Sequence, residues 1–326
     1  MSEAYQRSFA CIVGAPRTAT TSLAKFLRGH PQICFSKVKE PHFFSQWDLT
    51  DAPDDELRQA VTDEYLARYF PHLNGSQPLL MEGSVTYLYT PEQMEPILRL
   101  WPEAKFIIGL RDPMEMIPSL HQRLLFLGDE TVEDFEDAWE LNQDRREGRR
   151  IPRTCIEPRW LQYDRVGRLG EYADRLISVV GRERCFFALY DDVKRNPDGL
   201  YRQVQQFLGV PPRDASNFSP RRNSRGYRLG WLQRLLMRPP VLTRKIMAGK
   251  HYRRRVETIE RLRNGDSVPL RLVERARTRL LQWNETDCPP RRLSPRMRQL
   301  IRAHHLDDVS RLEAIINRDL SHWLSA

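Results

Sequence analysis

The sequence predicts an α/β protein in which a central parallel sheet is flanked by helices and a basic, helical C-terminal region follows. Two observations support this expectation. Short apolar runs alternate with amphipathic runs through the first two thirds of the chain, as in parallel sheets covered by helices. Beyond residue 220 the chain is rich in arginine and its pattern is helical. We expect a single domain, with an α/β core over residues 1–215 and a mostly helical basic part over residues 216–326.

The first predicted elements alternate between strand and helix. The apolar run at residues 8–13 indicates a buried strand, and the amphipathic run from Thr20 to Gly29 indicates a helix. A proline is acceptable in the first turn of a helix, so a helix is expected from Pro113 onward. Apolar runs predict further strands at residues 32–36, 78–84 and 104–111, and a helix is expected at residues 91–100.

The remaining core elements continue this alternation. Residues 131–147 predict an amphipathic helix that is acidic at its start and basic at its end. Residues 166–181 predict a helix that a glycine ends. Residues 184–192 indicate a strand running into a loop, and residues 196–210 indicate another helix. The predicted order is that of a sheet with crossover helices.

Composition narrows the class of protein. No stretch approaches 18 consecutive apolar residues, so we expect no membrane-spanning helix. The first residues hold no apolar signal segment, so we expect a cytoplasmic protein. The five cysteines are scattered and form no CxxC pair. We therefore expect reduced thiols, with neither a disulfide framework nor a metal site.

Positive charge is concentrated in one late segment. The formal net charge is +9, and residues 225–263 hold twelve Arg or Lys residues but only two acidic residues. This segment also holds apolar side chains such as Trp231 and Leu235, a pattern typical of helices that lie on anionic membranes. A mobile lid, a solvated helix pair and packing against the main domain are the alternatives. We expect no nucleic-acid partner, because no nucleic-acid motif accompanies the charge.

The turn after the first strand is a candidate anion site. A turn between a parallel strand and a helix presents backbone N–H groups at the positive end of the helix dipole. Gly14 permits a tight bend, and hydroxyl side chains follow it. The ATPase loop would need glycine at 19 and lysine at 20, where this chain has Ala19 and Thr20. The loop is therefore P-loop-like, with Arg17 as its nearest cation, and an ordinary capped turn remains the alternative.

Two further segments carry candidate functional side chains at the ends of predicted strands. The segment KVKEPHFFSQW, residues 37–47, brings a carboxylate and an imidazole to a strand end, where they could do acid–base work. In FIIGLRDPMEMIPSLHQR, residues 106–123, Arg111 ends an apolar strand and Ser119 lies in the following helix. An arginine at a strand end suits bidentate recognition of phosphate. The alternatives are an anchored surface loop and a local ion pair.

Together these segments resemble the sulfotransferases that use PAPS (3′-phosphoadenosine 5′-phosphosulfate). GAPRTATTSL is similar to the 5′-phosphosulfate loop of that family, and RDPxxxxxS to its 3′-phosphate motif. KEPHFF resembles the catalytic segment of heparan-sulfate-type members, and MEGSVTYLY, residues 81–89, resembles their E-K-[ST]-P-x-Y segment. The tail RLEAIINRDLSHWL, residues 311–324, looks like the end of bacterial members. The resemblance spans nearly the whole chain in the correct order.

The resemblance implies PAPS as the sulfuryl donor, no metal, and catalysis by positioning and electrostatic stabilisation. It implies that Glu40 or His42 is the base and that Arg17 stabilises the leaving phosphate. Acceptor binding is expected at Lys39, Glu82 and Tyr87. Donor binding is expected at Gly14, Ala15, Pro16, Arg17, Thr18, Ala19, Thr20, Thr21, Ser22, Arg111, Ser119, Arg221 and Arg222.

Departures from the family pattern mark where these expectations are weakest. Arg17 stands where many members have lysine, so it keeps the charge but does not readily release a proton. Met116 replaces the second arginine of the 3′-phosphate motif, and Arg221 and Arg222 are the expected substitutes. Gly83 replaces a lysine of the heparan-type enzymes, which argues against a glycosaminoglycan acceptor.

The expected acceptor is a hydroxyl group of a sugar, a glycolipid or another small molecule such as a natural product. Three other functions stay open at this point. A nucleotide kinase of the P-loop type would require Mg²⁺ and ATP. A basic protein that binds nucleic acid or membranes without catalysis would show salt-sensitive binding. A non-catalytic family member would bind the nucleotide only.

Overall fold

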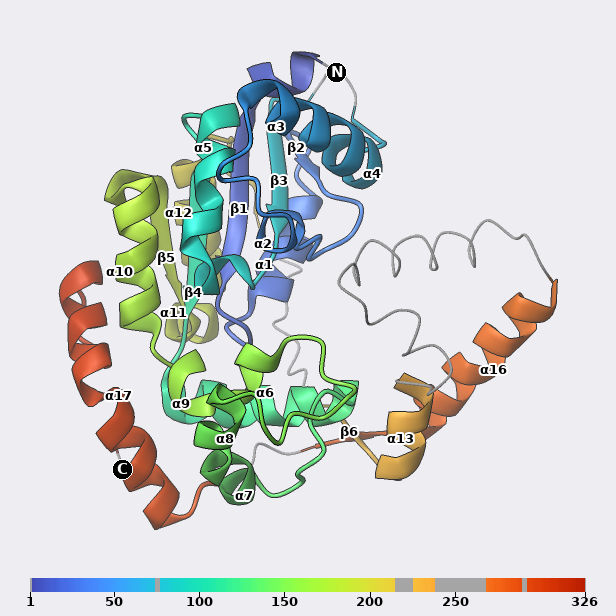
Figure 1. Ribbon diagram of the computed structural model, residues 1–326. Coiled ribbons are helices and arrows are strands. Elements are labelled where there is room, and N and C mark those ends of the chain that lie inside the picture. Colours follow the sequence, from blue (N-terminus) through green and yellow to red (C-terminus); the bar gives the residue numbers. More distant parts are fainter. Residues whose placement is uncertain (1, 74–76, 215–224, 238–267, 289–291, 326) are drawn as a thin grey trace. The chain divides into compact units, whose positions relative to one another are not determined.

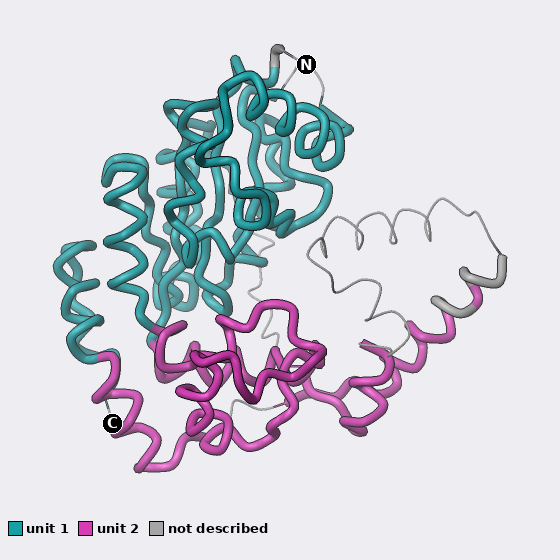
Figure 2. Tube along the Cα trace, viewed as in Figure 1, with its two compact units in different colours: residues 1–112, 168–221, 306–325 teal, residues 113–167, 222–305, 326 magenta. Residues whose placement is uncertain are grey.

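The structure is a computed structural model that describes residues 2–73, 77–214, 225–237, 268–288 and 292–325. The chain forms two compact units, which are coloured separately in Figure 2. The first unit comprises residues 1–112, 168–221 and 306–325, and the second comprises residues 113–167, 222–305 and 326. The predicted boundary near residue 215 stays a prediction, as does the single domain.

A five-stranded parallel sheet forms the centre of the first unit (Figure 1). Its strand order is β2-β3-β1-β4-β5, so β1 lies in the middle. This confirms the predicted parallel sheet flanked by helices. The strands are β1 (Ser8–Gly14), β2 (Ile33–Phe35), β3 (Leu79–Gly83), β4 (Lys105–Leu110) and β5 (Cys185–Leu189).

Alternation of side chains along the strands gives the sheet two buried faces. Ile12 of β1 belongs to one buried cluster with Leu27 and Val204, which come from the flanking helices α1 (Thr20–Arg28) and α12 (Pro197–Leu208). Phe9 points to the other face, where its ring stacks on Trp101 at 4.4 Å between centroids. Because both faces are covered, the strands read as continuous apolar runs, as parallel strands usually do.

The remaining helices of the first unit surround this sheet. Arg318, in the segment after α17, donates a hydrogen bond to Asp192 of α11. Asp308 of α17 accepts hydrogen bonds from the first backbone N–H groups of α10. The helices are α2 (Phe43–Gln46), α3 (Asp54–Ala60), a π-helical segment (Val61–Leu66), α4 (Ala67–Tyr69), α5 (Glu95–Leu100), α10 (Leu169–Val180), α11 (Tyr190–Arg195) and α17 (Pro295–Ile316), which begins in the second unit.

The second unit is mostly helical and is built around a buried ion pair. Arg145 and Glu130 are both fully buried, with Nη2 of the arginine 2.8 Å from Oε2 of the carboxylate. Tyr163 donates a hydrogen bond of 2.9 Å to the same carboxylate. The elements are α6 (Pro113–Leu127), α7 (Phe135–Glu140), α8 (Asn142–Arg146), α9 (Tyr163–Val166), α13 (Gly230–Met237), α16 (Val268–Asn284), and the antiparallel pair β6 (Arg225–Tyr227) and β7 (Glu285–Asp287).

Three predicted elements differ from the structure. The helix expected over residues 131–147 is two short helices, α7 and α8, because Leu141 separates them. The loop expected at residues 190–192 is wrong, since α11 begins at Tyr190 directly after β5. The basic region contains the β6–β7 pair, which the sequence analysis missed. Most of the basic segment, residues 238–263, lies outside the described residues.

Candidate functional site

The candidate site lies at the carboxyl edge of the parallel sheet. The chain leaves β1 toward β2 on one side and leaves β4 toward β5 on the other, so the sheet has a switch point between β1 and β4. Ligands of open α/β sheets bind at such a point. The residues that follow β1 and β3 each bond to a neighbouring strand: the N–H of Ala15 donates to the carbonyl of Gly109 in β4 at 2.9 Å, and the N–H of Ser84 donates to that of Ile12 in β1 at 2.9 Å.

The loop after β1 is tightly folded. Gly14 has φ of +150°, and a Cβ there would lie 2.8 Å from Cβ of Leu88, so this position requires glycine. The hydroxyl of Thr18 donates a hydrogen bond of 2.7 Å to the carbonyl of Ala15. Gly109 of β4 lies against this hydroxyl, because a Cβ at Gly109 would be 2.2 Å from it. The loop is therefore fixed by its own threonine and by the neighbouring strand.

The loop ends at the first turn of α1. Ala19 precedes the helix in the left-handed conformation, with φ of 66°. The first backbone N–H groups of a helix have no partner within it, which makes this turn favourable for an anion. Thr20 is buried, Ser22 is half-buried and Thr21 is exposed. Ala15 and Pro16 are buried, so they contribute backbone rather than accessible side chains.

Arg111 connects the end of β4 to this loop. Its Nη1 donates a hydrogen bond of 3.0 Å to the backbone carbonyl of Arg17, which itself has a left-handed backbone with φ of 66°. The guanidinium of Arg111 also lies over the ring of Tyr190, 4.1 Å from its centroid. Two of the predicted donor-binding arginines are thus brought together. The contact with Tyr190 was not expected from the sequence.

The last three predicted donor-binding residues belong to other parts of the chain. Ser119 lies half-buried on α6 in the second unit, and Met116 of the same helix is buried. Arg221 and Arg222 lie outside the described residues. Their expected roles stay predictions.

The segment after β2 carries two residues with an unusual backbone. Glu40 has φ of 67° and His42 has φ of 54°, although neither is a glycine. The left-handed region is uncommon for such residues, and Pro41 further restricts the residue before it. Strained residues of this kind cluster at functional sites, where the surrounding structure holds them in place. The backbone therefore marks KEPH as a candidate site independently of its side chains.

The Glu40 carboxylate lies between two positively polarised neighbours. Nζ of Lys39 contacts its Oε1, and Nε2 of His42 lies 3.5 Å from its Oε2. About one third of the Glu40 side chain is exposed, whereas His42 is fully buried. Burial alone would raise the pKa of Glu40, but Lys39 and His42 outweigh it and hold that pKa well below its usual range. Glu40 is therefore an ionised, accessible hydrogen-bond acceptor.

His42 is held from the segment after β3. Its Nδ1 lies 2.7 Å from Oγ1 of Thr86, and its backbone N–H donates a hydrogen bond of 2.9 Å to Oγ of Ser84. Ser45 contacts both the Thr86 hydroxyl, at 2.7 Å, and the His42 carbonyl, at 3.1 Å. These contacts fix the imidazole ring and direct Nε2 toward Glu40.

Behind this segment lies a buried carboxylate, Glu82 of β3. Three hydroxyls donate to it: Tyr87 at 2.6 Å, Ser84 at 2.6 Å and Tyr65 at 3.2 Å. Burial raises the pKa of Glu82 to about 7, because the hydroxyl donors only partly offset the loss of solvation. Ser84 thus joins the Glu82 carboxylate to the backbone of His42.

This geometry gives the predicted acceptor-binding residues different positions. Lys39 is partly exposed beside Glu40, in reach of a ligand. Glu82 and Tyr87 are fully buried and contact each other. Direct acceptor binding by these two stays a prediction, and their burial favours a supporting role. Ser84 and Thr86, which the sequence analysis did not single out, lie within the MEGSVTYLY segment that it quoted.

The part of the chain that the structure describes contains no cluster of three or more His, Cys, Asp or Glu side chains suited to a metal ion. Within the same described ranges, no helix combines the length and the apolar character needed to cross a membrane.

Comparison with known proteins gives a family match. A sequence model described as the sulfotransferase family matches residues 10–214. Bifunctional heparan sulfate N-deacetylase/N-sulfotransferase 2 of Bos taurus is 26% identical over 212 residues, and the match covers 62% of this chain but 22% of that protein. Carbohydrate sulfotransferase 15 of Mus musculus is 26% identical, with 62% of this chain and 43% of that protein covered. The chain thus spans less than half the length of these relatives.

A further relative and a solved structure agree with this match. Protein-tyrosine sulfotransferase A of Caenorhabditis elegans is 23% identical, with 64% of this chain and 52% of that protein covered. The crystal structure of a sulfotransferase from Alicyclobacillus acidocaldarius matches with a TM-score of 0.63 and 24% identity, over 98% of this chain and 99% of that one. The structural likeness shows a shared fold.

Proposed function

The chain belongs to the sulfotransferase family, and we propose that it moves a sulfuryl group from PAPS to a hydroxyl group of a carbohydrate, glycolipid or other small-molecule acceptor. The observation that carries this proposal is the Glu40 carboxylate, which is ionised and partly exposed at the sheet edge that also carries the Gly14–Ala19 loop. An anion-binding loop and an accessible general base at the same sheet edge are the minimum that sulfuryl transfer needs.

In the proposed reaction the acceptor oxygen attacks the sulfur atom of PAPS. The new oxygen–sulfur bond forms as the bond from sulfur to the 5′-phosphate oxygen breaks, and the acceptor proton passes to Glu40. Arg17 and the backbone N–H groups at the start of α1 stabilise the negative charge on the leaving phosphate. Arg111 binds the 3′-phosphate, a group that ATP lacks. The products are a sulfate ester and 3′-phosphoadenosine 5′-phosphate (PAP).

Burial supports Glu40 rather than His42 as the base. His42 is fully buried, so the acceptor hydroxyl can reach the partly exposed carboxylate of Glu40 but not the imidazole ring. We assign His42 the role of orienting the carboxylate through its Nε2. A carboxylate with a lowered pKa is a weak base, which suits a loose transition state in which the acceptor proton is lost late.

The acceptor class is drawn from the relatives. Carbohydrate acceptors are favoured because two of the relatives described above carry heparan sulfate or carbohydrate in their names, whereas one is named for protein tyrosine. We further propose a cytoplasmic location and contact of residues 225–263 with an anionic membrane.

Calorimetric titration with PAP in the absence of metal tests the donor, with ATP–Mg²⁺ as the control ligand. We expect PAP to bind and ATP–Mg²⁺ to bind far more weakly, because ATP offers no 3′-phosphate to Arg111. Binding of ATP–Mg²⁺ alone, or of neither ligand, would overturn the proposal.

A second assay separates the acceptor classes. Radiolabelled PAPS is incubated with the enzyme and either a panel of oligosaccharides and glycolipids or a panel of tyrosine-containing peptides. Label transferred to a sugar supports the proposed acceptor, and label transferred only to peptides replaces it with a tyrosine acceptor.

A further inference from the structure

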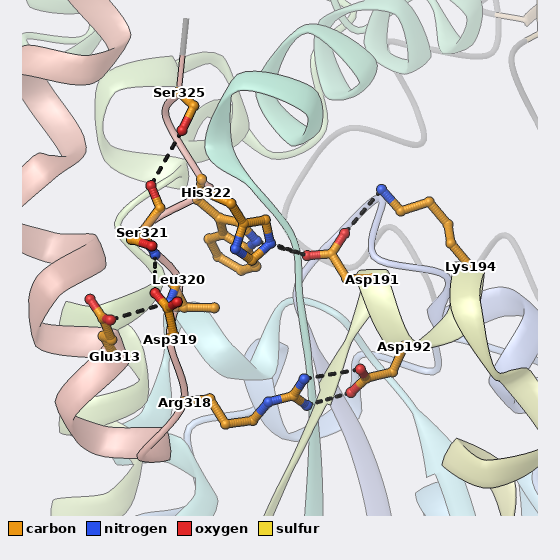
Figure 3. A network of polar contacts seen from close by, with 11 residues as sticks. Asp191, Asp192, Lys194, Glu313, Arg318, Asp319, Leu320, Ser321, His322 and Ser325 are labelled. Carbon is orange, nitrogen blue, oxygen red and sulfur yellow. Dashed lines mark hydrogen bonds and ion pairs between the residues drawn. The ribbon is translucent and has the colours of Figure 1, made fainter.

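The C-terminal turn of the chain is fastened to the first turn of α11 (Figure 3). Arg318 contacts both carboxylate oxygens of Asp192, with Nη2 3.0 Å from Oδ1. The indole N–H of Trp323 donates a hydrogen bond of 2.9 Å to Oδ2 of Asp191, and Nε2 of His322 lies 3.1 Å from the same oxygen. Lys194 approaches the other Asp191 oxygen at 3.0 Å. We call these contacts the C-terminal clasp.

The clasp has the features of a fixed contact rather than of a mobile surface ion pair. Trp323 is buried, and Leu320 beside it is fully buried, so apolar packing anchors the turn. Arg318 donates two hydrogen bonds to the Asp192 carboxylate, and this bidentate contact adds geometric specificity. Burial opposes ionisation of Asp191, but Trp323, His322 and Lys194 outweigh it and lower its pKa to about 2, so the carboxylate is charged at neutral pH.

A series of contacts links the C-terminal clasp to the loop after β1. Asp191 and Asp192 follow Tyr190, the first residue of α11, and the Tyr190 ring lies under the guanidinium of Arg111. Arg111 in turn donates to the backbone carbonyl of Arg17 in the loop after β1. A short series of contacts within the first unit therefore joins the C-terminal turn to the proposed phosphate-binding arginine.

We propose that residues 318–323 are a positioning element of the donor site, which holds Arg111 ready for the 3′-phosphate without touching any substrate. This inference rests on the proposed donor assignment. An arginine side chain has many rotamers, and binding must fix one of them. The clasp fixes the first turn of α11, and Tyr190 is the first residue of that helix. The Tyr190 ring therefore has a fixed position, and the guanidinium of Arg111 stacks on it. Arg111 is thereby ordered before the ligand arrives, which lowers the cost of binding.

Two ligands test this role, because they differ at the group that Arg111 is proposed to bind. PAP carries a 3′-phosphate, whereas adenosine 5′-monophosphate (AMP) is the same nucleotide without it. In Asp191→Asn and Arg318→Gln we expect the Kd for PAP to rise about two- to fivefold, the scale of a lost cation–π arrangement. We expect the Kd for AMP to stay at its wild-type value.

A matched control and a rescue separate positioning from general damage. Arg175→Gln breaks another exposed ion pair of the first unit, with Glu92, and should leave both Kd values unchanged. Tyr190→Phe keeps the ring and should bind PAP as the wild type does, whereas Tyr190→Leu should weaken PAP binding alone. If Asp191→Asn does not fold, Trp323→Phe provides the milder test, since it removes the N–H donor and keeps an aromatic ring.

The outcomes are distinguishable. Equal weakening of both ligands, or weakening of neither, overturns the positioning role while the donor assignment stands. If the wild-type protein does not prefer PAP over AMP, the assignment of Arg111 to the 3′-phosphate is wrong, and the proposed donor assignment is overturned before the clasp is tested.

Discussion

Nε2 of His42 lies 3.5 Å from Oε2 of Glu40, and it joins a fully buried ring to a partly exposed carboxylate. The Thr86 hydroxyl beside Nδ1 of His42 fixes the ring from behind, so the pair has a defined direction toward Glu40. An acceptor hydroxyl can therefore meet the carboxylate first. This relationship leads to the first of three predictions.

Replacing Glu40 tests the assignment of the base. Glu40→Gln keeps the size of the side chain but removes its ability to take a proton, so turnover should fall by about 10² or more. The measurement is release of labelled sulfate from PAPS with water as the acceptor, which needs no knowledge of the natural acceptor. Glu64→Gln is the control, because Glu64 is a comparably exposed carboxylate paired with Arg68. Unchanged turnover in Glu40→Gln would exclude Glu40 as the base.

The buried carboxylate of Glu82 should make the stability of the protein depend on pH. Its pKa in the folded state is about 7, above the usual 4.5, so the folded state binds a proton that the unfolded state releases. This contribution is fully present below pH 4.5 and is lost as pH rises through 7. Between pH 5 and pH 8 the wild type should therefore lose about 2 to 3 kcal/mol more unfolding free energy than Glu82→Gln.

Urea denaturation at the two pH values measures this difference. Tyr65→Phe provides a matched comparison, because it removes one hydroxyl that favours the charged carboxylate and keeps the ring. In Tyr65→Phe the pKa of Glu82 should rise further, so we expect the loss of unfolding free energy to extend to higher pH than in the wild type. Parallel stability curves for the wild type and Glu82→Gln would contradict the raised pKa.

Gly109 should be required for the shape of the donor loop. In Gly109→Ala the new Cβ would lie 2.2 Å from Oγ1 of Thr18, so the threonine must move and its hydrogen bond to Ala15 is lost. We expect a loss of about 1 to 3 kcal/mol in unfolding free energy, together with weaker PAP binding.

Gly83→Ala is the matched control for this prediction. Gly83 ends β3, which lies on the other side of β1 from β4, and a Cβ there meets its nearest atom, in Ile12, at 3.4 Å, which is ordinary contact. Urea denaturation and PAP calorimetry should show little change for this variant. Equal effects of the two substitutions would mean that the close approach of Thr18 to Gly109 is not what shapes the loop.

The strands and the tight turn after β1 could be predicted because their signals are local. Each strand of the sheet is an apolar run bounded by turn residues, and Gly14 stands where only glycine suits the backbone. The end of β5 was misread for a local reason as well. Asp191 and Asp192 resemble a turn, but acidic residues also favour the first turn of a helix, and α11 begins there.

The role of Glu82 could not be predicted, because it depends on residues distant in sequence. Whether a strand residue faces a ligand or the interior depends on what covers each face of the sheet. Tyr65, from a π-helical segment 17 residues earlier, covers the face to which Glu82 points. The left-handed backbone at Glu40 and His42 likewise leaves no sequence signal, since glycine is the residue that normally marks it.

The strand order also bears on how such a protein can diverge. Because β2 and β3 lie on one side of β1, and β4 and β5 on the other, the segments with Glu40 and Thr86 are separated from those with Arg111 and Tyr190. Mutations that reshape the proposed acceptor side need not disturb the proposed nucleotide side. Related proteins can therefore evolve to modify new acceptors while they keep the same proposed sulfuryl donor.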